Sequence, residues 1–433
     1  MAFRLYLDEC LKSNVKSLNK NILTFKELGL AEKLLEGIDS MGYKTATPVQ
    51  EQVMKPILAG RDVLASAQTG TGKTAAFLLP IIHKLLSEDH SENHINALII
   101  VPTRELAVQI AGNMEGLGYF TNVSCMPVYG GGDGNSFTSE KTALTSGVDL
   151  VVCTPGRMIA HLNMGYVDLS HVKYLVLDEA DRMLDMGFHD DLMKITGYLP
   201  KQRQNLLFSA TMPPKMRDLA RKLMNDPVEV NIAVSKPPEA IVQEAFVVYE
   251  KQKSPLVKYL LKRQDYTRVI VFCSRKQNVK SLTSDLKRAR FSVEEIHSDL
   301  EQDVREQVLQ DFRNKKTKIL VATDILSRGI DIDEIELVIN YDVPNDGEDY
   351  IHRIGRTARA QTKGTAYTLI TEAEQRKFAA IERLLEKEVT KSPVPEEFGE
   401  VPAYNPAAAK APHSGGGGFK GKKKVWKKRP PKA

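Results

Sequence analysis

Short apolar runs separated by helical stretches recur along the whole chain. In the first half they are DVLASA, ALIIVPT, VDLVVCTP, VKYLVLDE and QNLLFSAT, at 62–67, 97–103, 148–155, 172–179 and 204–211. In the second half they are RVIVFCS, KILVATD, LVINYDVP and GTAYTLIT, at 268–274, 318–324, 337–344 and 364–371. Continuous rather than alternating apolar character is typical of strands that are buried on both faces. The pattern therefore predicts an α/β protein with two tandem parallel sheets, each flanked by helices.

Two changes in composition divide the chain. Residues 233–240 are polar and contain Pro237 and Pro238, as expected of a linker between domains. From Ser392 onward Pro, Ala, Gly and Lys dominate, which predicts disorder. The first twenty residues fit either a short amphipathic helix or an artefact of the chosen start site. We predict an N-terminal extension over 1–21, a first domain over 22–232, a linker over 233–240, a second domain over 241–391 and a disordered basic tail over 392–433.

The charge is distributed unevenly. The net charge is +5, but residues 420–433 carry eight Lys or Arg and no acid, which leaves −3 for residues 1–419. Such a tail attracts polyanions through counterion release. The four cysteines form no CxxC pair, and no apolar run approaches the roughly 18 residues of a membrane helix. The start lacks the features of a secretory signal. We expect a cytoplasmic, monomeric protein that does not bind membranes.

A glycine-rich turn joins the first apolar run to the helical pattern AAFLLPIIHKLL at 75–86. Backbone N–H groups of such a turn surround phosphate at a helix N-terminus. Lys73 would neutralise the β- and γ-phosphates, and the Thr74 hydroxyl would bind Mg²⁺. The usual pattern has Gly at position 67, and a chance Gly-rich turn is the alternative. The second half has no such loop, so we predict one nucleotide site. Its loop residues are Ala67, Gln68, Thr69, Gly70, Thr71, Gly72, Lys73 and Thr74.

Three carboxylates, Asp178, Glu179 and Asp181, directly follow the apolar run 174–177. A nucleoside triphosphate needs Mg²⁺, which prefers oxygen ligands, so Asp178 at the end of a buried strand is the predicted metal ligand. Glu179 would then act on the attacking water as a general base or by positioning it. An acidic first turn of a helix is the alternative. The phosphate loop upstream weighs against that alternative.

Further short motifs occur in a fixed order. The first domain carries GYKTATPVQ, AQTGTGKT, PTRELA, YGG, TPGR, DEAD and SAT, at 42–50, 67–74, 102–107, 129–131, 154–157, 178–181 and 209–211. The second carries VFCSR, ATD, SRGID and HRIGRTAR, at 271–275, 322–324, 327–331 and 352–359. Over about residues 22–385 the chain resembles the DEAD-box family of ATP-dependent RNA helicases, most closely bacterial RhlE-type members. The family also has Ala at the first position of the phosphate loop. The resemblance implies two RecA-like domains, ATP and Mg²⁺ as cofactors, and RNA as partner.

The resemblance also implies how the nucleotide is recognised. Gln50 and Thr47 would read the adenine edge, with Phe25 stacked nearby. A Gln side chain suits this role because its amide supplies both a donor and an acceptor. Asp331 resembles the family's contact to the ribose, and Gly329 belongs to the same motif.

Two further sets of residues follow from the resemblance. Arg356, with Arg353, resembles the arginine finger, because planar guanidinium groups suit the charge that develops on a transferred phosphoryl group. These arginines lie in the domain without a phosphate loop, so ATP hydrolysis would require closure of the two domains on RNA. The link between hydrolysis and closure resembles the set Asp181, Ser209, Thr211 and His352.

The implied RNA contacts use arginines, small hydroxyls and exposed backbone. This chemistry suits phosphates and 2′-OH groups rather than base edges, so binding would not depend on sequence. The residues are Arg104, Gly130, Gly131, Thr154, Arg157, Arg275, Arg305 and Thr323. An ordinary surface charge is the alternative for each arginine. In the tail, Phe419 and Trp426 interleave with lysines, which suits stacking on unpaired bases, and a solubilising charge run is the alternative.

Three residues depart from the family pattern: Ala46 where Pro is common, and Ser298 and Ala358 where Gly is usual. None of these changes removes a charged or catalytic group. We expect an RNA-dependent ATPase that opens short duplexes locally, with ribonucleoprotein or ribosome-assembly particles as candidate partners. The alternatives are a DNA-directed helicase of the same superfamily and a non-catalytic or slow ATP-gated RNA clamp.

Overall fold

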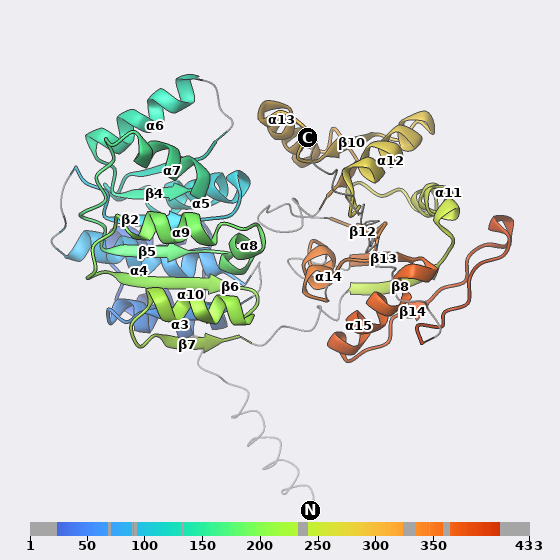
Figure 1. Cartoon of the computed structure of the whole chain (residues 1–433), viewed down its shortest axis with the longest axis horizontal. Coiled ribbons are helices and arrows are strands. Elements are labelled where there is room, and N and C mark those ends of the chain that lie inside the picture. Colours follow the sequence, from blue (N-terminus) through green and yellow to red (C-terminus); the bar gives the residue numbers. More distant parts are fainter. Residues whose placement is uncertain are drawn as a thin grey trace, which may run out of the picture.

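The computed structural model contains two sheets, one in each half of the chain (Figure 1). We name the first half lobe 1 (24–232) and the second half lobe 2 (241–407). Within the part of the chain that the structure describes, no helix combines the length and apolar character needed to cross a membrane. The described residues are 24–67, 71–88, 90, 93–130, 134–232, 241–323, 335–345, 347–357 and 364–407.

The sheet of lobe 1 has the strand order β3-β4-β2-β5-β6-β1-β7, and all neighbouring strands are parallel. The strands are β1 (Val63–Ser66), β2 (Ala97–Ile100), β3 (Cys125–Val128), β4 (Leu150–Cys153), β5 (Tyr174–Leu177), β6 (Gln204–Ser209) and β7 (Val228–Asn231). Alternate residues of one strand enter different clusters, since Ile99 packs on one face and Ile100 on the other. Both faces are buried, which confirms the interpretation of the continuous apolar runs.

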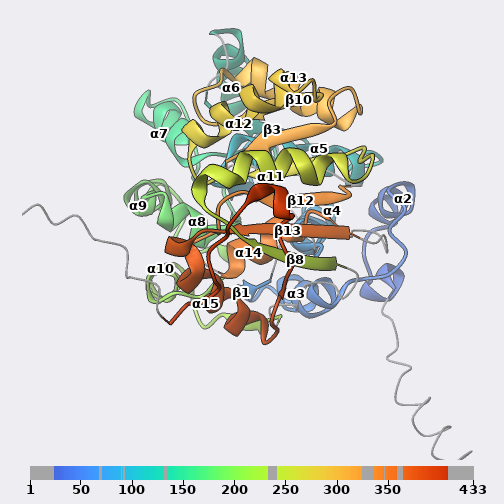
Figure 2. The same cartoon turned by 90° about the vertical axis from the view of Figure 1, so that its right-hand side faces the viewer.

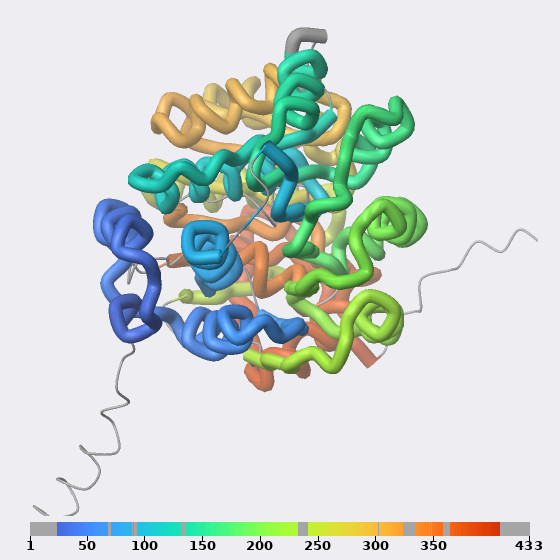
Figure 3. The backbone as a smooth tube through the Cα atoms, turned by 90° about the vertical axis from the view of Figure 1, so that its left-hand side faces the viewer, coloured from blue at the N-terminus to red at the C-terminus, as the bar shows by residue number. Residues whose placement is uncertain are grey.

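Helices cover both faces of this sheet (Figure 3). One face packs against η1 (Phe25–Leu28), α2 (Glu32–Ser40), α3 (Pro48–Leu58), α4 (Lys73–Ser87) and α5 (Arg104–Leu117). The other packs against α6 (Gly134–Ser146), α7 (Pro155–Asn163), α8 (Ala180–Asp185), α9 (His189–Thr196) and α10 (Pro214–Leu223). The start of α3 is encoded locally, because Thr47 caps the helix through the Gln50 N–H and Pro48 occupies its first position.

Lobe 2 repeats the architecture with the order β10-β11-β9-β12-β13-β8-β14, again parallel throughout. Its strands are β8 (Ile241–Val247), β9 (Val269–Phe272), β10 (Val293–Ile296), β11 (Ile319–Ala322), β12 (Leu337–Asn340), β13 (Gly364–Ile370) and β14 (Thr390–Lys391). One face packs against α11 (Glu250–Lys262) and α12 (Lys276–Arg288), seen in front of the sheet in Figure 2. The other packs against α13 (Gln302–Arg313), α14 (Gly347–Ile354) and α15 (Gln375–Leu385). The predicted fold class, two RecA-like α/β domains, is confirmed.

The two lobes face each other across the carboxyl ends of the lobe 1 strands. The carboxyl ends of the lobe 1 strands point toward lobe 2, and α13 and α14 lie on the side of lobe 2 that faces lobe 1 (Figure 1). Arg305 of α13 forms an ion pair with Glu105 of α5, and both side chains are largely buried. Ligands of α/β proteins bind at the carboxyl ends of parallel strands. A ligand in that position would therefore lie between the lobes.

The segment 392–407 differs from the sequence-based prediction of a disordered tail that begins at 392. It includes η5 (Glu396–Phe398) and packs against lobe 2. The buried side chain of Gln252 donates hydrogen bonds to the carbonyls of Phe398 (2.8 Å) and Glu400 (2.9 Å). The buried Gln375 donates to the carbonyl of Ala403 (2.8 Å). The Pro- and Ala-rich composition favours disorder, but these two glutamines satisfy the segment's backbone. The predicted boundary at 392 is therefore wrong for 392–407, and 408–433 lie outside the described residues.

Candidate functional site

The phosphate loop ends in a glycine that the local geometry requires. Gly72 precedes α4 with a φ of 90°, in the left-handed region. A Cβ at this position would lie 2.5 Å from the Gln50 side-chain nitrogen. Glycine thus meets both the conformational and the steric demand. Ala67, at the start of the loop, is buried and its N–H donates to the Ser209 carbonyl (2.9 Å). The predicted Gln68, Thr69 and Gly70 lie outside the described residues.

Lys73 and Asp178 form a buried pair at the carboxyl ends of β1 and β5. The Lys73 Nζ lies 4.0 Å from Asp178 Oδ1, and neither side chain is more than 5% exposed. Within the described residues that Nζ donates no hydrogen bond. Burial raises the pKa of Asp178 to about 6, against the attraction of Lys73, and the charge of Glu179 adds to the rise. A bound cation would relieve this cost, so the oxygens of Asp178 and the half-buried Thr74 fit a Mg²⁺ site.

Glu179 has an unusual backbone conformation, with a φ of 51°. A left-handed conformation is uncommon for a residue other than glycine and often marks a functional position. Its side chain is buried, and Arg182 Nη1 donates to its Oε2 at 3.3 Å. The carboxylate is therefore held in place at the edge of the site by a charged partner one helical turn away.

Three of the four predicted coupling residues are in contact. Thr211 N–H donates to Asp181 Oδ2 (3.0 Å), and the Ser209 hydroxyl donates to the Thr211 carbonyl (2.6 Å). The acidic cluster after β5 is thus joined directly to the end of β6. The fourth residue, His352, is buried in α14 of lobe 2.

The residues predicted to read adenine bind the phosphate loop in this structure. The Thr47 hydroxyl donates to the Thr71 carbonyl (2.8 Å), and Gln50 Nε2 donates to the Gly72 carbonyl (3.1 Å). Gln50 Oε1 accepts the Thr47 N–H (2.9 Å). Phe25 is only 3% exposed and belongs to the apolar core of lobe 1, which leaves little of its ring to stack on a base.

In lobe 2 both predicted arginine fingers are buried. Arg353 is fully buried, and its Nη1 donates to Asn340 Oδ1 (3.3 Å) and to the Asp342 carbonyl (2.9 Å). Its guanidinium also lies over the ring of Phe272. Arg356, two residues after the end of α14, is 3% exposed. The structure does not bring either arginine onto the Lys73–Asp178 pair. The predicted Gly329 and Asp331 lie outside the described residues.

Five of the eight predicted RNA contacts line one groove of about 450 Å³. The predicted RNA contacts that line this groove are Arg104, Gly130, Thr154, Arg157 and Arg305. Two of the remaining three lie elsewhere, since Arg275 is the exposed N-cap of α12 and Thr323 follows β11; Gly131 lies outside the described residues. The groove spans the junction between the lobes, because Arg305 comes from lobe 2 and the other four residues come from lobe 1.

Three charged residues that the sequence did not single out complete the site. Glu105 pairs with Arg305, Arg182 lines the groove and binds Glu179, and Glu140 binds Arg157 Nε (2.6 Å). Glu105 lies within the PTRELA motif and Arg182 directly follows the DEAD motif. Their positions in the sequence could therefore have pointed to the site. Glu140 gave no such signal, because it lies on a different helix from Arg157.

A phosphate loop with two adjacent carboxylates in one RecA-like lobe, and buried arginines in a second, defines a two-lobed nucleoside triphosphate-driven enzyme. Models of known families agree with that class. Residues 47–219 match the DEAD/DEAH box helicase family, and residues 252–361 match the helicase conserved C-terminal domain. The chain belongs to the DEAD/DEAH box helicase family.

Similar proteins extend the comparison. The chain is 42% identical over 364 residues to the ATP-dependent RNA helicase CshA of Listeria monocytogenes, covering 84% of this chain and 69% of that protein. It is 40% identical over 373 residues to the DEAD-box ATP-dependent RNA helicase CshA of Geobacillus kaustophilus, covering 86% and 79%. Among solved structures, Saccharomyces cerevisiae Dbp5 bound to RNA and ADP BeF3 gives a TM-score of 0.78 at 30% identity, covering 86% and 96%. Mss116p bound to ssRNA and AMP-PNP gives 0.79 at 30%, covering 88% and 82%. The RhlE-type subtype stays a prediction.

Proposed function

We propose that this chain is an ATP-dependent RNA helicase, in which RNA-stimulated ATP hydrolysis drives local, sequence-independent opening of short duplexes. One observation carries the proposal. Arg182 donates to Glu179 beside the Lys73–Asp178 pair and also lines the groove that holds Arg104 and Arg157. The hydrolytic carboxylates and the RNA-type donors thus share one edge of lobe 1. The relatives named as RNA helicases and the two similar structures bound to RNA support the same function.

The nucleotide end of the site suits Mg²⁺-ATP. Lys73 would neutralise the β- and γ-phosphates, and Thr74 and Asp178 would hold the metal. Mg²⁺ supplies positive charge at the transferred phosphoryl group. The Asp178 carboxyl, whose pKa is raised by burial, ionises more readily beside that charge. Gln50 and Thr47 would bind the adenine edge. They would do so either by giving up their present hydrogen bonds to the phosphate loop or while keeping them.

Glu179 would position the attacking water and accept its proton. Its backbone conformation and its bond to Arg182 hold the carboxylate in one orientation. The Asp181–Ser209–Thr211 contacts would carry the state of the phosphate site to the end of β6. The Mg²⁺ site and these carboxylates belong to lobe 1 alone. Lobe 1 therefore binds nucleotide, but it needs lobe 2 for fast hydrolysis.

The arginine finger comes from the opposite lobe. Arg356 would be that finger, and Arg353 would have to leave Asn340 and the Asp342 carbonyl to reach a phosphate. RNA bound in the groove touches both lobes and would favour their closure. Closure then delivers the finger, so hydrolysis depends on RNA. His352, buried beside Arg353 in α14, would join the coupling residues at that point. We place this reaction in the cytoplasm.

The test compares ATP turnover without nucleic acid, with RNA and with DNA of the same sequence. The variants are Glu179→Gln, which keeps the shape of the proposed base, and Glu115→Gln, an exposed glutamate of α5 that serves as the matched control. We expect RNA alone to stimulate turnover. The Glu179→Gln protein should bind ATP and hydrolyse almost none, and Glu115→Gln should behave like the unmodified protein.

Each contrary outcome identifies an alternative. Equal stimulation by DNA would favour a DNA-directed helicase of the same superfamily. ATP-dependent RNA binding without turnover would favour an ATP-gated clamp. Full turnover in Glu179→Gln would show that the base is a different residue.

A further inference from the structure

Two histidines and an aspartate gather at the amino-terminal edge of the lobe 1 sheet. Strands β2 and β5 pair so that Ala97 lies opposite Tyr174. His94 stands three residues before the first and His171 three residues before the second, so the register places both at the same level. The buried Asn96 connects the segment before β2 to the segment before β5, because its carbonyl accepts hydrogen bonds from the N–H groups of Lys173 and Tyr174. This edge is the end of lobe 1 opposite the ATP site, since the nucleotide residues follow the carboxyl ends of the strands.

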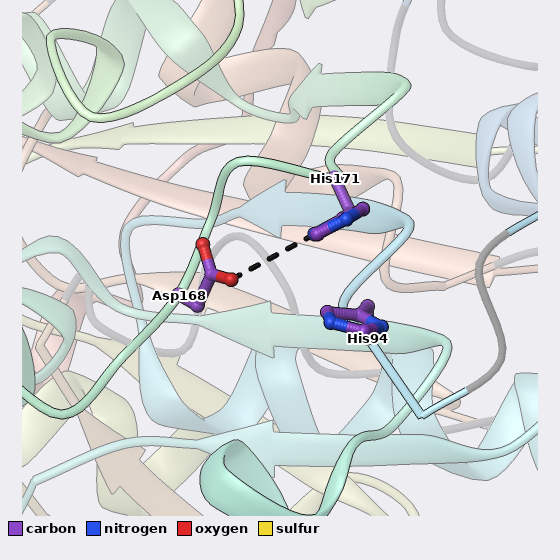
Figure 4. Close-up of side chains that lie close together, drawn as sticks. All are labelled: His94, Asp168 and His171. Atoms are coloured by element: carbon purple, nitrogen blue, oxygen red, sulfur yellow. Dashed lines mark ion pairs between the residues drawn. The ribbon is translucent and has the colours of Figure 1, made fainter.

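The side chains of this cluster converge (Figure 4). One potential ligand atom from each of His94, Asp168 and His171 lies within 4.8 Å of the other two. The two imidazole rings are 3.9 Å apart between centroids, and Asp168 Oδ2 lies 3.7 Å from His171 Nδ1. Donor atoms around a tetrahedral Zn²⁺ are separated by about 3.3 Å, given metal–nitrogen bonds of about 2.0 Å. Partly exposed side chains can make that adjustment by rotating about their χ angles.

The Ser170 backbone orients the Asp168 carboxylate. Ser170 N–H donates to Asp168 Oδ1 (2.9 Å), which leaves Oδ2 directed at His171. The Ser170 hydroxyl lies 3.1 Å from His171 Nδ1. An oriented carboxylate favours a metal site over a chance surface cluster.

We propose that His94, Asp168 and His171 form a binding site for Zn²⁺. Two imidazoles and one carboxylate are a zinc-type donor set, and Mg²⁺ prefers oxygen ligands alone. A bound ion would join the segment before β2 to the segment before β5. It would stabilise lobe 1 at the edge away from the nucleotide, with no part in hydrolysis.

The test is calorimetric titration of the chelator-treated full chain with Zn²⁺, in excess Mg²⁺ to occupy sites made of carboxylates alone. We expect one Zn²⁺ per chain. His94→Ala and His171→Ala should each weaken binding more than tenfold. His189→Ala is the matched control, because His189 also lies beside an aspartate, Asp190 (3.0 Å), but without a second histidine in the cluster.

ATP turnover and circular dichroism of every variant should match those of the unmodified protein, which separates loss of zinc from loss of fold. Unchanged Zn²⁺ affinity in the His94→Ala/His171→Ala double variant would overturn the proposal. Absence of binding by the unmodified chain would overturn it as well.

A second, independent observation concerns Glu140 of α6. This buried carboxylate accepts hydrogen bonds from Arg157 Nε (2.6 Å), His161 Nε2 (2.8 Å) and the Tyr129 N–H (3.1 Å). The fully buried ring of His161 is stacked on Phe137, and the guanidinium of Arg157 lies over the same Phe137 ring, 4.6 Å from its centroid. Glu140 therefore joins two segments that enter the groove: Tyr129 precedes Gly130, and Arg157 ends the TPGR motif.

We infer that Glu140 is a positioning residue, which fixes Arg157 relative to the Gly130 backbone so that both meet one RNA strand. This inference rests on the proposed RNA contact of Arg157. Charge alone makes the opposite prediction, since removal of an acid beside an RNA groove should strengthen RNA binding. The sign of the effect therefore distinguishes positioning from simple electrostatics.

The test measures RNA-stimulated ATP turnover of Arg157→Ala, Glu140→Ala and the double variant. We expect Arg157→Ala to raise the KM for RNA roughly tenfold, the loss of one charge-assisted hydrogen bond. Glu140→Ala should raise it severalfold, with kcat and the KM for ATP unchanged, and the double variant should be no worse than Arg157→Ala. If Arg157→Ala has no effect, the proposed RNA contact fails. If it has its effect but Glu140→Ala lowers the KM, or the two effects multiply, the positioning role fails.

Discussion

Asp178→Asn replaces a buried carboxylate with a neutral amide of the same shape, and it should affect stability and activity in opposite directions. Burial raises the pKa of Asp178 from 3.8 to about 6, an increase of about two units. At 1.36 kcal/mol per unit, the ionised carboxylate costs the folded state about 3 kcal/mol. That figure already contains the attraction of Lys73, which lies 4.0 Å away. It is an upper limit for the variant, because a buried amide also needs hydrogen-bond partners.

The pH dependence follows from the direction of the shift. The folded-state pKa of Asp178 lies above its unfolded value of 3.8. The folded state is therefore stabilised by the protonated Asp178 fully below about pH 3.8, and this stabilisation is lost as the pH rises through about 6. The Asp178→Asn variant does not ionise at this position. Its advantage over the unmodified protein should therefore be near zero below pH 3.8 and reach its maximum above about pH 7.

Scanning calorimetry of the nucleotide-free protein measures this difference. For a lobe of this size, about 3 kcal/mol corresponds to a Tm increase of at most about 6–12 °C for the lobe 1 transition. ATP hydrolysis should be lost in the same variant, because Asp178 is the proposed Mg²⁺ ligand. The control is Asp181→Asn, which disturbs the bond to the Thr211 N–H and should not stabilise the protein. If the Asp178→Asn protein is no more stable than the unmodified one at about pH 8, or if the difference is independent of pH, the reasoning is refuted.

Three further changes test other parts of the structure. Gly72→Ala should destabilise lobe 1 by about 1–2 kcal/mol and weaken ATP binding, because its φ is 90° and its Cβ would meet Gln50; Gly112→Ala, with open space around it, should do neither in the same calorimetric and binding assays. Glu105→Gln removes the charge partner of Arg305 across the lobes, so small-angle scattering should give a larger radius of gyration without ligands; an unchanged radius would show that the pair does not hold the lobes together. Deletion of 412–433 should weaken RNA binding and reduce its log–log salt slope by up to about 6 while ATP binding is retained; an unchanged slope would contradict a role of the tail in RNA binding.

The buried strands were predictable because both of their faces are apolar. Strands β2, β4 and β5 are continuous apolar runs, and the structure buries every residue in them. Edge strands carry a weaker signal, because only part of each is buried. Strand β10 (VEEI) contains two glutamates, and β3 (CMPV) contains a proline that an edge position tolerates.

The residues of the candidate site also fall into those that the sequence could predict and those that it could not. Residues whose roles depend on a local turn, such as Gly72 and Lys73, could be predicted from contiguous sequence. The partners of Arg157 and Arg305 could not, because Glu140 and Glu105 lie 17 and 200 positions away and meet them only through tertiary packing. The sequence also contained no information on the burial of Arg353, a residue of α14 whose guanidinium contacts Asn340 of β12 and Phe272 of β9.

The packed segment 392–407 determines where an isolated second lobe can end. Strand β14 is the last strand of the lobe 2 sheet and covers β8 along only two residues. A protein cut at 391 would leave the side chains of Gln252 and Gln375 without the carbonyls that now accept from them. It would also lose the Ser392 N–H, which donates to the Ala245 carbonyl of β8 (2.8 Å). A second lobe expressed alone should therefore extend to residue 407, and a version cut at 391 should be less stable because these buried side chains lose their partners.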